Sequence, residues 1–414
     1  MKLELAEFLR DFEAMTDIGK TPDGGSERLS MSDEDMQARK TLIGLLKAEG
    51  LAVEEDSTGA IWARLEGEEP ALPAVLVGSH IDTVRNGGKY DGLLGVMLGF
   101  QALRQIKRSG AAHKRALELV VFPTEESARF NYPTVGSKLL AGRLEPEKLK
   151  EMKDRDGISL YDALVSRGFD PAHPQAGQQR LKSACSMIEL HIEQGPLLEK
   201  SGVSVGVVSA IAAPTRLAVE IRGEYAHSGA CPMFLRRNAM TASAEFILAV
   251  ERIGIAEAVN QSVAAVTLCE MVNGSMNVVP GHVKMVVDIR GIDMDSVNRC
   301  VLGVERHLRS IADLRNVRCV HHVISSDKPV PMSDRMISVI RKAADKCHIR
   351  SKVMPSGAGH DAMNVASAIE TGMIFIPCKD GVSHNPAEAV KNEDVADGFA
   401  VLYTALLDEA NRCK

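Results

Sequence analysis

Four short runs of apolar residues, each followed by a polar, turn-forming segment, constrain the fold of this chain more than any other feature. They occupy residues 73–78 (PAVLVG), 117–122 (LELVVF), 187–190 (MIEL) and 373–376 (MIFI). Each run is short and mostly apolar, which is typical of a strand that is covered on both faces. Helical patterns lie between the runs, so the sequence predicts an α/β fold in which helices flank a mixed sheet.

The pattern changes between about residues 213 and 330, where apolar and polar residues alternate along the expected strands. Alternation indicates strands with one face in water. The expected elements are a strand at 215–222, a helix at about 235–254, strands at 262–269 and 282–290, a helix at about 295–312 and a strand at 317–325. This order is a split β-α-β, ferredoxin-like pattern. We therefore expect one domain of residues 1–212 and 331–414, interrupted by a smaller α+β domain of residues 213–330.

Length and composition exclude several classes of protein. A chain of 414 residues is long enough for two domains, and its formal net charge of −6 argues against a basic surface for nucleic acids or anionic membranes. No apolar run approaches the roughly 18–20 residues that span a bilayer. The opening segment alternates acidic and apolar residues, unlike a signal peptide, and the eight cysteines include no C-x-x-C pair. We therefore expect a cytoplasmic protein with reduced thiols.

Histidines and carboxylates follow all four apolar runs. They are His80, Asp82 and Asp91 after the first run, Glu125 and Glu126 after the second, His191 after the third and His384 after the last. Ligands bind at the carboxyl ends of strands in open α/β sheets, so we expect these side chains to meet at one edge. A single histidine is more often structural, and two adjacent glutamates can be a solvated helix start. Their coincidence at four strand ends indicates a site for zinc, manganese, cobalt or nickel.

Eight longer segments, in the same order along the chain, resemble the M20 metallopeptidase-like superfamily and specifically its amidase/hydantoinase/carbamoylase branch. The segments are GSHIDTVRNGGKYDGLLGV, PTEESARF, ELHIEQGP, GEYAHSGACPM, NVVPG, DIRG, GAGHDA and SHNPAE. That branch contains N-carbamoyl-L-amino acid hydrolases, β-ureidopropionase and allantoate amidohydrolase. The resemblance implies a metal-dependent amidohydrolase that cleaves the C–N bond of an N-carbamoyl amino acid or a related ureido acid.

The resemblance also implies two divalent metal ions per subunit, bridged by Asp91. His80 and His191 would complete the ligands of one ion, and Glu126 and His384 those of the other. Zinc is the expected metal, with manganese, cobalt and nickel as alternatives. Three protein ligands for each ion leave a position open for water, as catalytic rather than structural sites require.

Three further residues acquire catalytic roles from the resemblance. Glu125 resembles the general base, which takes a proton from the water that bridges the metals and passes it to the leaving nitrogen. Asp82 would orient His80 without binding a metal. His227 would donate a hydrogen bond to the oxyanion and the substrate. The family places the equivalent histidine in the neighbouring subunit's active site, which implies a homodimer whose inserted domain serves as lid and dimerisation domain.

The resemblance assigns the grip on the substrate to Gln194, Asn277 and Arg290, with His360 as a further residue lining the pocket. The planar fork of Arg290 suits a carboxylate, so we expect a small anionic ureido or amide substrate. A salt-bridged surface arginine is the plainer interpretation of Arg290, and a surface histidine in a turn is that of His227.

Four residues depart from the family pattern. Ser228, Ala230 and Cys231 stand where the family commonly has alanine and two threonines, and Asn238 stands where aspartate is common. None of them is an expected metal ligand, so the departures bear on the choice of substrate and not on the chemistry. The alternatives are an M20-type aminoacylase or dipeptidase, many of which have a carboxylate in place of His191, and a non-catalytic protein that has lost a ligand or the base.

Overall fold

A computed structural model describes residues 2–412 of the chain. They form two compact units, the first made of Met1–Ser209 with Pro331–Lys414 and the second of Ala210–Val330. Seven of the cysteines expected to be reduced are free thiols, and Cys413 lies outside the described residues. Within residues 2–412, no helix combines the length and the apolar character needed to cross a membrane.

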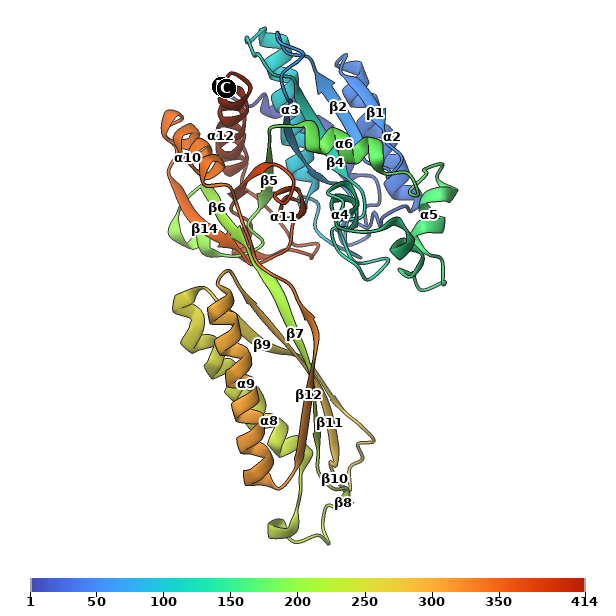
Figure 1. Cartoon of the computed structure of the whole chain (residues 1–414), viewed down its shortest axis with the longest axis vertical. Helices are drawn as coiled ribbons and strands as arrows, with labels where there is room; N and C mark the ends of the chain where they lie inside the picture. The colour runs from blue at the N-terminus through green and yellow to red at the C-terminus, as the bar shows by residue number, and fades with distance from the viewer. Residues whose placement is uncertain (1, 413–414) are drawn as a thin grey trace. The chain divides into compact units, whose positions relative to one another are not determined.

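The large sheet has nine strands in the order β1-β2-β4-β3-β5-β15-β6-β13, with β14 paired to β6 (Figure 1). The strands are β1 (Ala52–Glu55), β2 (Ile61–Leu65), β3 (Val75–His80), β4 (Leu117–Phe122), β5 (Ser186–Ile192), β6 (Val205–Ile211), β13 (Val330–Pro331), β14 (Ser351–Ser356) and β15 (Glu370–Ile376). Strand β3 runs parallel to β4 and β5, and β15 runs parallel to β5. Because β2 and β6 run antiparallel to their neighbours, the sheet is mixed.

The four predicted apolar runs are the parallel strands β3, β4, β5 and β15, so the predicted mixed α/β fold is confirmed. Every residue of β3, β4 and β5 is buried, as expected for strands covered on both faces. Two boundaries differ from the prediction. Strand β3 extends to His80, which pairs with Phe122, and β5 extends past His191, which pairs with Phe375. Both histidines therefore lie within strands rather than after them.

Helices cover both faces of this sheet. Apolar residues of α1 (Leu5–Thr16), α2 (Asp33–Ala48), α3 (Leu93–Ser109), α10 (Asp334–Lys346) and α12 (Asn392–Ala410) share one core with the sheet. A second core joins the strands to α4 (Val135–Leu140), α6 (Gln175–Ser183) and α11 (Ala362–Val365). The short helices α5 (Leu160–Ser166) and α7 (Leu197–Ser201) complete the first unit. The sheet is thus held between two helical layers, which leaves its strand ends free to carry a site.

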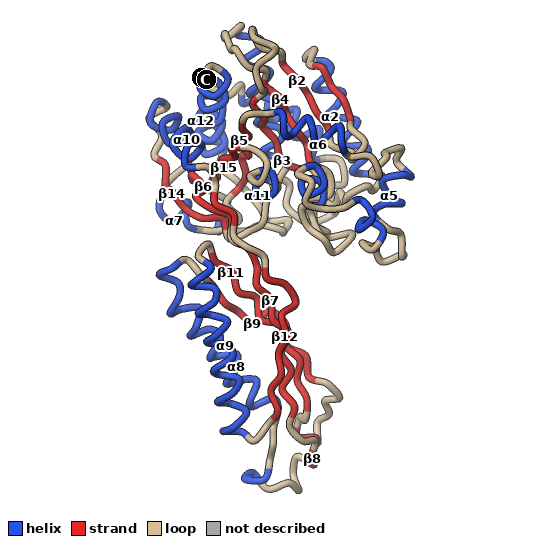
Figure 2. The backbone as a smooth tube through the Cα atoms, in the orientation of Figure 1, coloured by secondary structure: helices blue, strands red, loops and turns tan. Residues whose placement is uncertain are grey.

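The second unit is a four-stranded antiparallel sheet in the order β12-β7-β11-β9, with two helices on one face (Figure 2). Its main elements are β7 (Ala213–Arg222), α8 (Ala239–Glu257), β9 (Val263–Met271), β11 (His282–Gly291), α9 (Met294–Arg315) and β12 (Arg318–Ser326). Strand β7 alternates buried and half-buried residues, and its buried side chains pack against Phe246 and Val304. The elements follow the order that the alternating pattern predicts.

One helix of this unit begins later than predicted. Residues 233–235 form a short 3-10 turn, and α8 starts at Ala239. The start is fixed by Asn238, whose Oδ1 accepts hydrogen bonds from the N–H groups of Met240 (2.9 Å) and Thr241 (3.3 Å). Because asparagine and aspartate cap helices about equally well, this departure from the family pattern preserves the helix start.

Candidate metal centre

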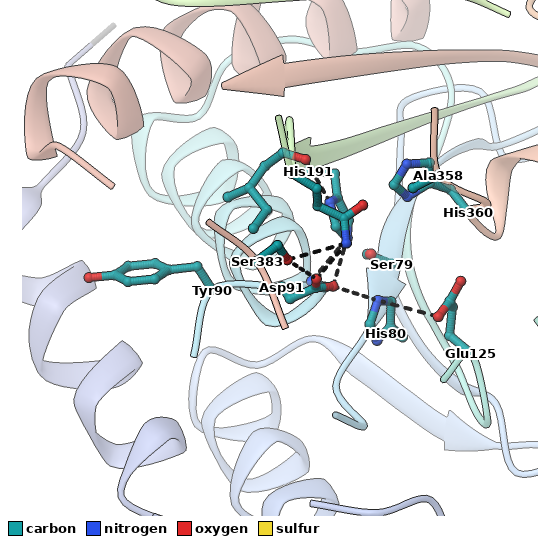
Figure 3. A network of polar contacts seen from close by, with 12 residues as sticks. Ser79, His80, Tyr90, Asp91, Glu125, His191, Ala358, His360 and Ser383 are labelled. Carbon is teal, nitrogen blue, oxygen red and sulfur yellow. Dashed lines mark hydrogen bonds and ion pairs between the residues drawn. The ribbon is translucent and has the colours of Figure 1, made fainter. Parts of the chain in front are cut away.

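The predicted ligands meet at the carboxyl ends of the parallel strands, and Figure 3 shows three of them, His80, Asp91 and His191. His80 ends β3, His191 is the last residue but one of β5, and Asp91 precedes α3. The loops after β4 and β15 supply Glu126 and His384. Parallel strands bring residues that are up to about 300 positions apart in the sequence to one edge of a sheet.

Within the described part of the chain two groups of three ligand atoms form, and Asp91 belongs to both: His80, Asp91 and His191 in one, and Asp91, Glu126 and His384 in the other. Oδ1 of Asp91 lies 3.5 Å from Nε2 of His80 and 3.2 Å from Nε2 of His191. Oδ2 of Asp91 lies 3.4 Å from Nε2 of His384, which is also 3.4 Å from Oε1 of Glu126. Each oxygen of one carboxylate thus faces a different group.

The carboxyl groups of this cluster are buried close together. Burial raises the pKa of Glu125 well above its ordinary value; His80 opposes the rise, and the charges of Glu126 and Asp361 add to it. Burial and the charge of Asp91 raise the pKa of Glu126 to about 7. Burial would also raise the pKa of Asp91, but His191, His384 and His80 hold it well below its ordinary value. Positive charge at the centre of this cluster would therefore stabilise the ionised carboxylates.

The neighbouring carboxylates also shift the pKa values of the histidines. Contact with Asp91 raises the pKa of His384 to about 9. Burial opposes a charge on His80, but the carboxylates of Glu125, Asp91 and Asp82 raise its pKa well above the ordinary value. Imidazoles and carboxylates that compensate one another in this way are a donor set that a divalent cation fits, since the cation replaces the protons they would otherwise hold.

The orientation of two imidazoles also fits a cation. Nδ1 of His80 lies 3.0 Å from the carbonyl oxygen of Asp82, and Nδ1 of His191 lies 2.9 Å from that of Ile192. Because a carbonyl oxygen only accepts, each Nδ1 carries a proton and donates it. Nε2 is then the nitrogen that faces Asp91 in both rings, which is the usual arrangement of metal-binding histidines.

The side chain of Asp82 lies near His80 and makes its hydrogen bonds to the following turn. Its Oδ1 lies 3.7 Å from Nδ1 of His80, too far for a hydrogen bond, and the backbone carbonyl makes that contact instead. The carboxylate accepts hydrogen bonds from the N–H groups of Glu125 (3.2 Å) and Glu126 (3.0 Å). Asp82 therefore fixes the turn that carries both glutamates. Glu125 reaches His80 at 3.9 Å and is a member of neither ligand group among the described residues.

Gln194 and His360, both predicted to meet substrate, touch the ligands. Nε2 of Gln194 donates to Oδ2 of Asp91 at 2.7 Å. His360 is buried, lies 2.9 Å from Oγ of Ser356 through its Nε2, and packs edge-on against the ring of His191 at 4.6 Å between centroids (Figure 3). Burial and the charge of His191 hold the pKa of His360 well below its ordinary value. His360 therefore supports His191 as a neutral ring.

The loops of the centre hold strained backbone. Thr124, Gln194 and His384 have φ angles of 55°, 57° and 55°, a left-handed conformation that residues other than glycine rarely adopt. Each residue is a ligand or lies beside one of the predicted site residues. Such strain persists only where the surroundings enforce it, and it gathers at functional sites.

Sequence reasoning did not single out Ser383 and Glu388. Oγ of Ser383 donates to Asp91 (2.9 Å) and lies 3.1 Å from Glu388. The buried carboxylate of Glu388 accepts hydrogen bonds from the N–H groups of Tyr90 (2.7 Å) and Asp91 (3.1 Å). The only signal was their place in the segment SHNPAE, because an acid in a loop otherwise suggests an exposed side chain.

The remaining predicted residues belong to the second unit, where β8 (Ala226–His227) pairs with β10 (Val278–Val279). His227 and Asn277 are neighbours, since the N–H of Ser228 donates to the carbonyl oxygen of Asn277 at 2.8 Å. Arg290 belongs to β11 of the four-stranded sheet, and its guanidinium lies 3.1 Å from Asp288. From His282 to Arg290 is eight residues of β11, or about 27 Å. Strand β8 lies toward the end of the four-stranded sheet at which β11 begins (Figure 1).

Residues 76–408 match the sequence profile described as "Peptidase family M20/M25/M40". The chain is 35% identical to a Pseudomonas sp. (strain NS671) protein named N-carbamoyl-L-amino-acid amidohydrolase, over 95% of this chain and 96% of the relative. It is 34% identical to the allantoate amidohydrolase of Escherichia coli (strain K12), over 94% of each chain.

A solved structure gives the same assignment. The crystal structure of an amidase of the hydantoinase/carbamoylase family from Burkholderia multivorans superposes with a TM-score of 0.93 at 30% identity, and the match covers 100% of this chain and 99% of that one. The resemblance drawn from eight sequence segments is thereby confirmed. The profile, the relatives and the solved structure each match this chain along most of its length, and the chain belongs to peptidase family M20/M25/M40.

Proposed function

We propose that this protein is a metal-dependent amidohydrolase that cleaves a C–N bond of an N-carbamoyl amino acid or a related ureido acid. One observation carries the proposal: Asp91 is shared between two ligand groups, while Glu125 lies beside them and belongs to neither. The named activities of the relatives support the choice of substrate class over an aminoacylase or dipeptidase.

His80, Asp91 and His191 would hold one divalent ion, and Asp91, Glu126 and His384 a second. Zinc is the expected metal, with manganese, cobalt and nickel as alternatives. When bound, such ions supply Lewis acidity, which makes water a nucleophile near neutral pH and polarises the substrate carbonyl.

Glu125 moves the proton in this proposal. Because burial raises its pKa well above the ordinary value, it is a stronger base than an exposed carboxylate. It takes a proton from the attacking water and delivers it to the leaving nitrogen as the C–N bond breaks. The products are an amine and a carbamic acid, which decomposes to ammonia and carbon dioxide. The carboxylate of Asp82 keeps Glu125 in place by accepting a hydrogen bond from the backbone N–H of Glu125.

Substrate binding falls to the residues that the resemblance assigns to it. Arg290 would hold the carboxylate of the substrate through its fork, Asn277 and Gln194 its amide groups, and His227 the carbonyl oxygen as it becomes an oxyanion. His360 would line the pocket from behind His191.

The separation within the second unit supports a homodimer. Arg290 stands about 27 Å along β11 from His282, and His227 belongs to the separate two-stranded β8–β10 sheet at the His282 end. This separation exceeds the reach of one small substrate. If both contact the same substrate, they come from two copies of the chain. We therefore propose a symmetric dimer in which residues 213–330 serve as lid and dimerisation domain, residues 1–212 and 331–414 hold the metals, and His227 acts in the partner's site.

A substrate panel tests the proposal. N-carbamoyl-L-amino acids, N-carbamoyl-β-alanine, allantoate and simple dipeptides are each incubated with the protein and zinc, manganese, cobalt or nickel, and the release of ammonia and of free amine is measured. We expect ammonia and amine in equal amounts from at least one N-carbamoyl amino acid. Hydrolysis of dipeptides alone would support the aminoacylase or dipeptidase alternative.

A further inference from the structure

The loop after β8 is built around the ring of His227. The N–H groups of Gly229 and Ala230 each donate to Nδ1 of His227 at 3.1 Å. The N–H of Cys231 donates to the carbonyl oxygen of His227 at 3.1 Å and closes the turn. The loop thus points two backbone donors at one ring nitrogen.

Arg236 holds the opposite side of this loop. Its Nη2 donates to the carbonyl oxygens of Ser228 (2.5 Å) and Cys231 (2.9 Å), and its Nε donates to that of Cys231 (3.1 Å). The half-buried guanidinium is therefore a fork that joins the first and last residues of the turn.

One peptide group links the two sets of contacts. The peptide between Ser228 and Gly229 accepts a hydrogen bond from Arg236 at its carbonyl oxygen and donates one to His227 from its N–H. A trans peptide points these two groups in opposite directions, so the guanidinium and the imidazole lie on either side of it. A cation at the carbonyl oxygen polarises the peptide and makes its N–H a better donor.

These contacts determine which ring nitrogen carries the proton. Nδ1 of His227 accepts two N–H groups, so it has no proton of its own, and Nε2 carries it. We propose that Arg236 is a positioning residue that fixes His227 as the Nε2–H tautomer, which is the donor that the substrate carbonyl requires. The catalytic use of this tautomer rests on the proposed function. The tautomer itself follows from the hydrogen bonds of the loop alone.

The proposal also accounts for three departures from the family pattern. Every contact of Ser228, Ala230 and Cys231 that fixes His227 or binds Arg236 uses a backbone atom. The side chains at these positions can therefore change without altering the proton on His227. Their effect is limited to what the loop presents to a substrate.

The test combines NMR spectroscopy with kinetics on the full-length, metal-loaded protein. Nitrogen-15 spectra of histidine-labelled protein report which ring nitrogen is protonated, and His227→Ala identifies the signal. We expect a single Nε2–H form in the unchanged protein and a mixture of both tautomers in Arg236→Met. We expect kcat to fall about tenfold, less than the 10²–10³ that losing an oxyanion donor costs, with KM and bound metal unchanged. Arg222→Met, which removes an exposed arginine paired with Glu220, is the matched control and should change neither readout.

The outcomes separate this inference from the proposed function. A folded Arg236→Met protein that keeps the single Nε2–H form would overturn the inference. If the mixture forms but kcat is unchanged, Arg236 fixes the tautomer as inferred and the catalytic role proposed for His227 is wrong. Arg236→Lys serves if the methionine variant does not fold: it keeps the charge without the fork, and a single tautomer with full kcat in this variant would refute the role of the fork.

Discussion

Glu388 is the residue outside the ligand set whose loss should most weaken metal binding. Its carboxylate accepts hydrogen bonds from the N–H groups of Tyr90 and Asp91 and lies 3.1 Å from Ser383, which itself donates to Asp91. Glu388→Ala would leave the two backbone N–H groups without their acceptor. At about 1–3 kcal/mol for each unsatisfied group, this costs about 2–6 kcal/mol of folding free energy.

The same substitution removes a carboxylate that helps to hold Asp91 in place, both directly through the N–H of Asp91 and through Ser383. Losing an outer partner of a metal ligand typically lowers metal affinity about 10–100-fold, and the shared position of Asp91 extends the loss to both ligand groups. Glu388→Gln keeps one acceptor oxygen and the volume of the side chain, so both effects should be smaller.

Competition with a chromophoric chelator measures the affinity for zinc, and thermal unfolding of the metal-free variant measures the stability. Glu393→Ala, which removes an exposed acid from the first turn of α12, is the control and should match the unchanged protein. A folded Glu388→Ala protein that binds zinc as tightly as the unchanged chain would refute the reasoning.

Three further predictions follow from the same site. Glu125→Gln should retain its metal by elemental analysis but lose about 10²–10⁴ in kcat; loss of a metal instead would make Glu125 a ligand. Glu125→Gln and His227→Ala should each be nearly inactive, whereas mixed dimers formed by subunit exchange should restore about a quarter of the sites. Native mass spectrometry verifies the exchange. If exchange occurs and activity does not return, His227 does not act across the dimer. In the metal-free protein the pKa values of the ligands Glu126 and His384 are raised to about 7 and 9 from 4.5 and 6.5, so the stabilisation that their bound protons give is lost as pH rises from the ordinary to the raised values. Metal displaces those protons, and the gain in Tm on adding metal should therefore grow between about pH 6 and pH 9; a constant gain would contradict this.

The strands and the ligands could be predicted from the sequence because each depends on a local pattern. A run such as residues 117–122 is apolar at every position but Glu118, which is typical of a strand covered on both faces. Parallel pairing then brings the ends of such runs together, which is why His80 and Glu126 could be assigned to one edge before any contact was known.

The features that could not be predicted depend on long-range contacts. Glu388 lies about 300 residues from the backbone N–H groups it binds, and no spacing in the sequence reports that contact. At Asp82 the backbone carbonyl contacts His80, while the side-chain carboxylate accepts from two backbone N–H groups. This arrangement depends on how one turn folds. Likewise, the placement of His227 on the two-stranded β8–β10 sheet and of Arg290 far along β11 follows from strand pairing and not from either motif.

The most direct test of the central claim is a metal titration of the chelator-treated protein. Bound zinc or manganese per chain and the release of ammonia from an N-carbamoyl-L-amino acid are measured on the same samples. The arrangement of two ligand groups around Asp91 predicts no activity without metal and full activity at two ions per chain. Full activity in the metal-free protein, or saturation of activity at one ion per chain, would contradict it.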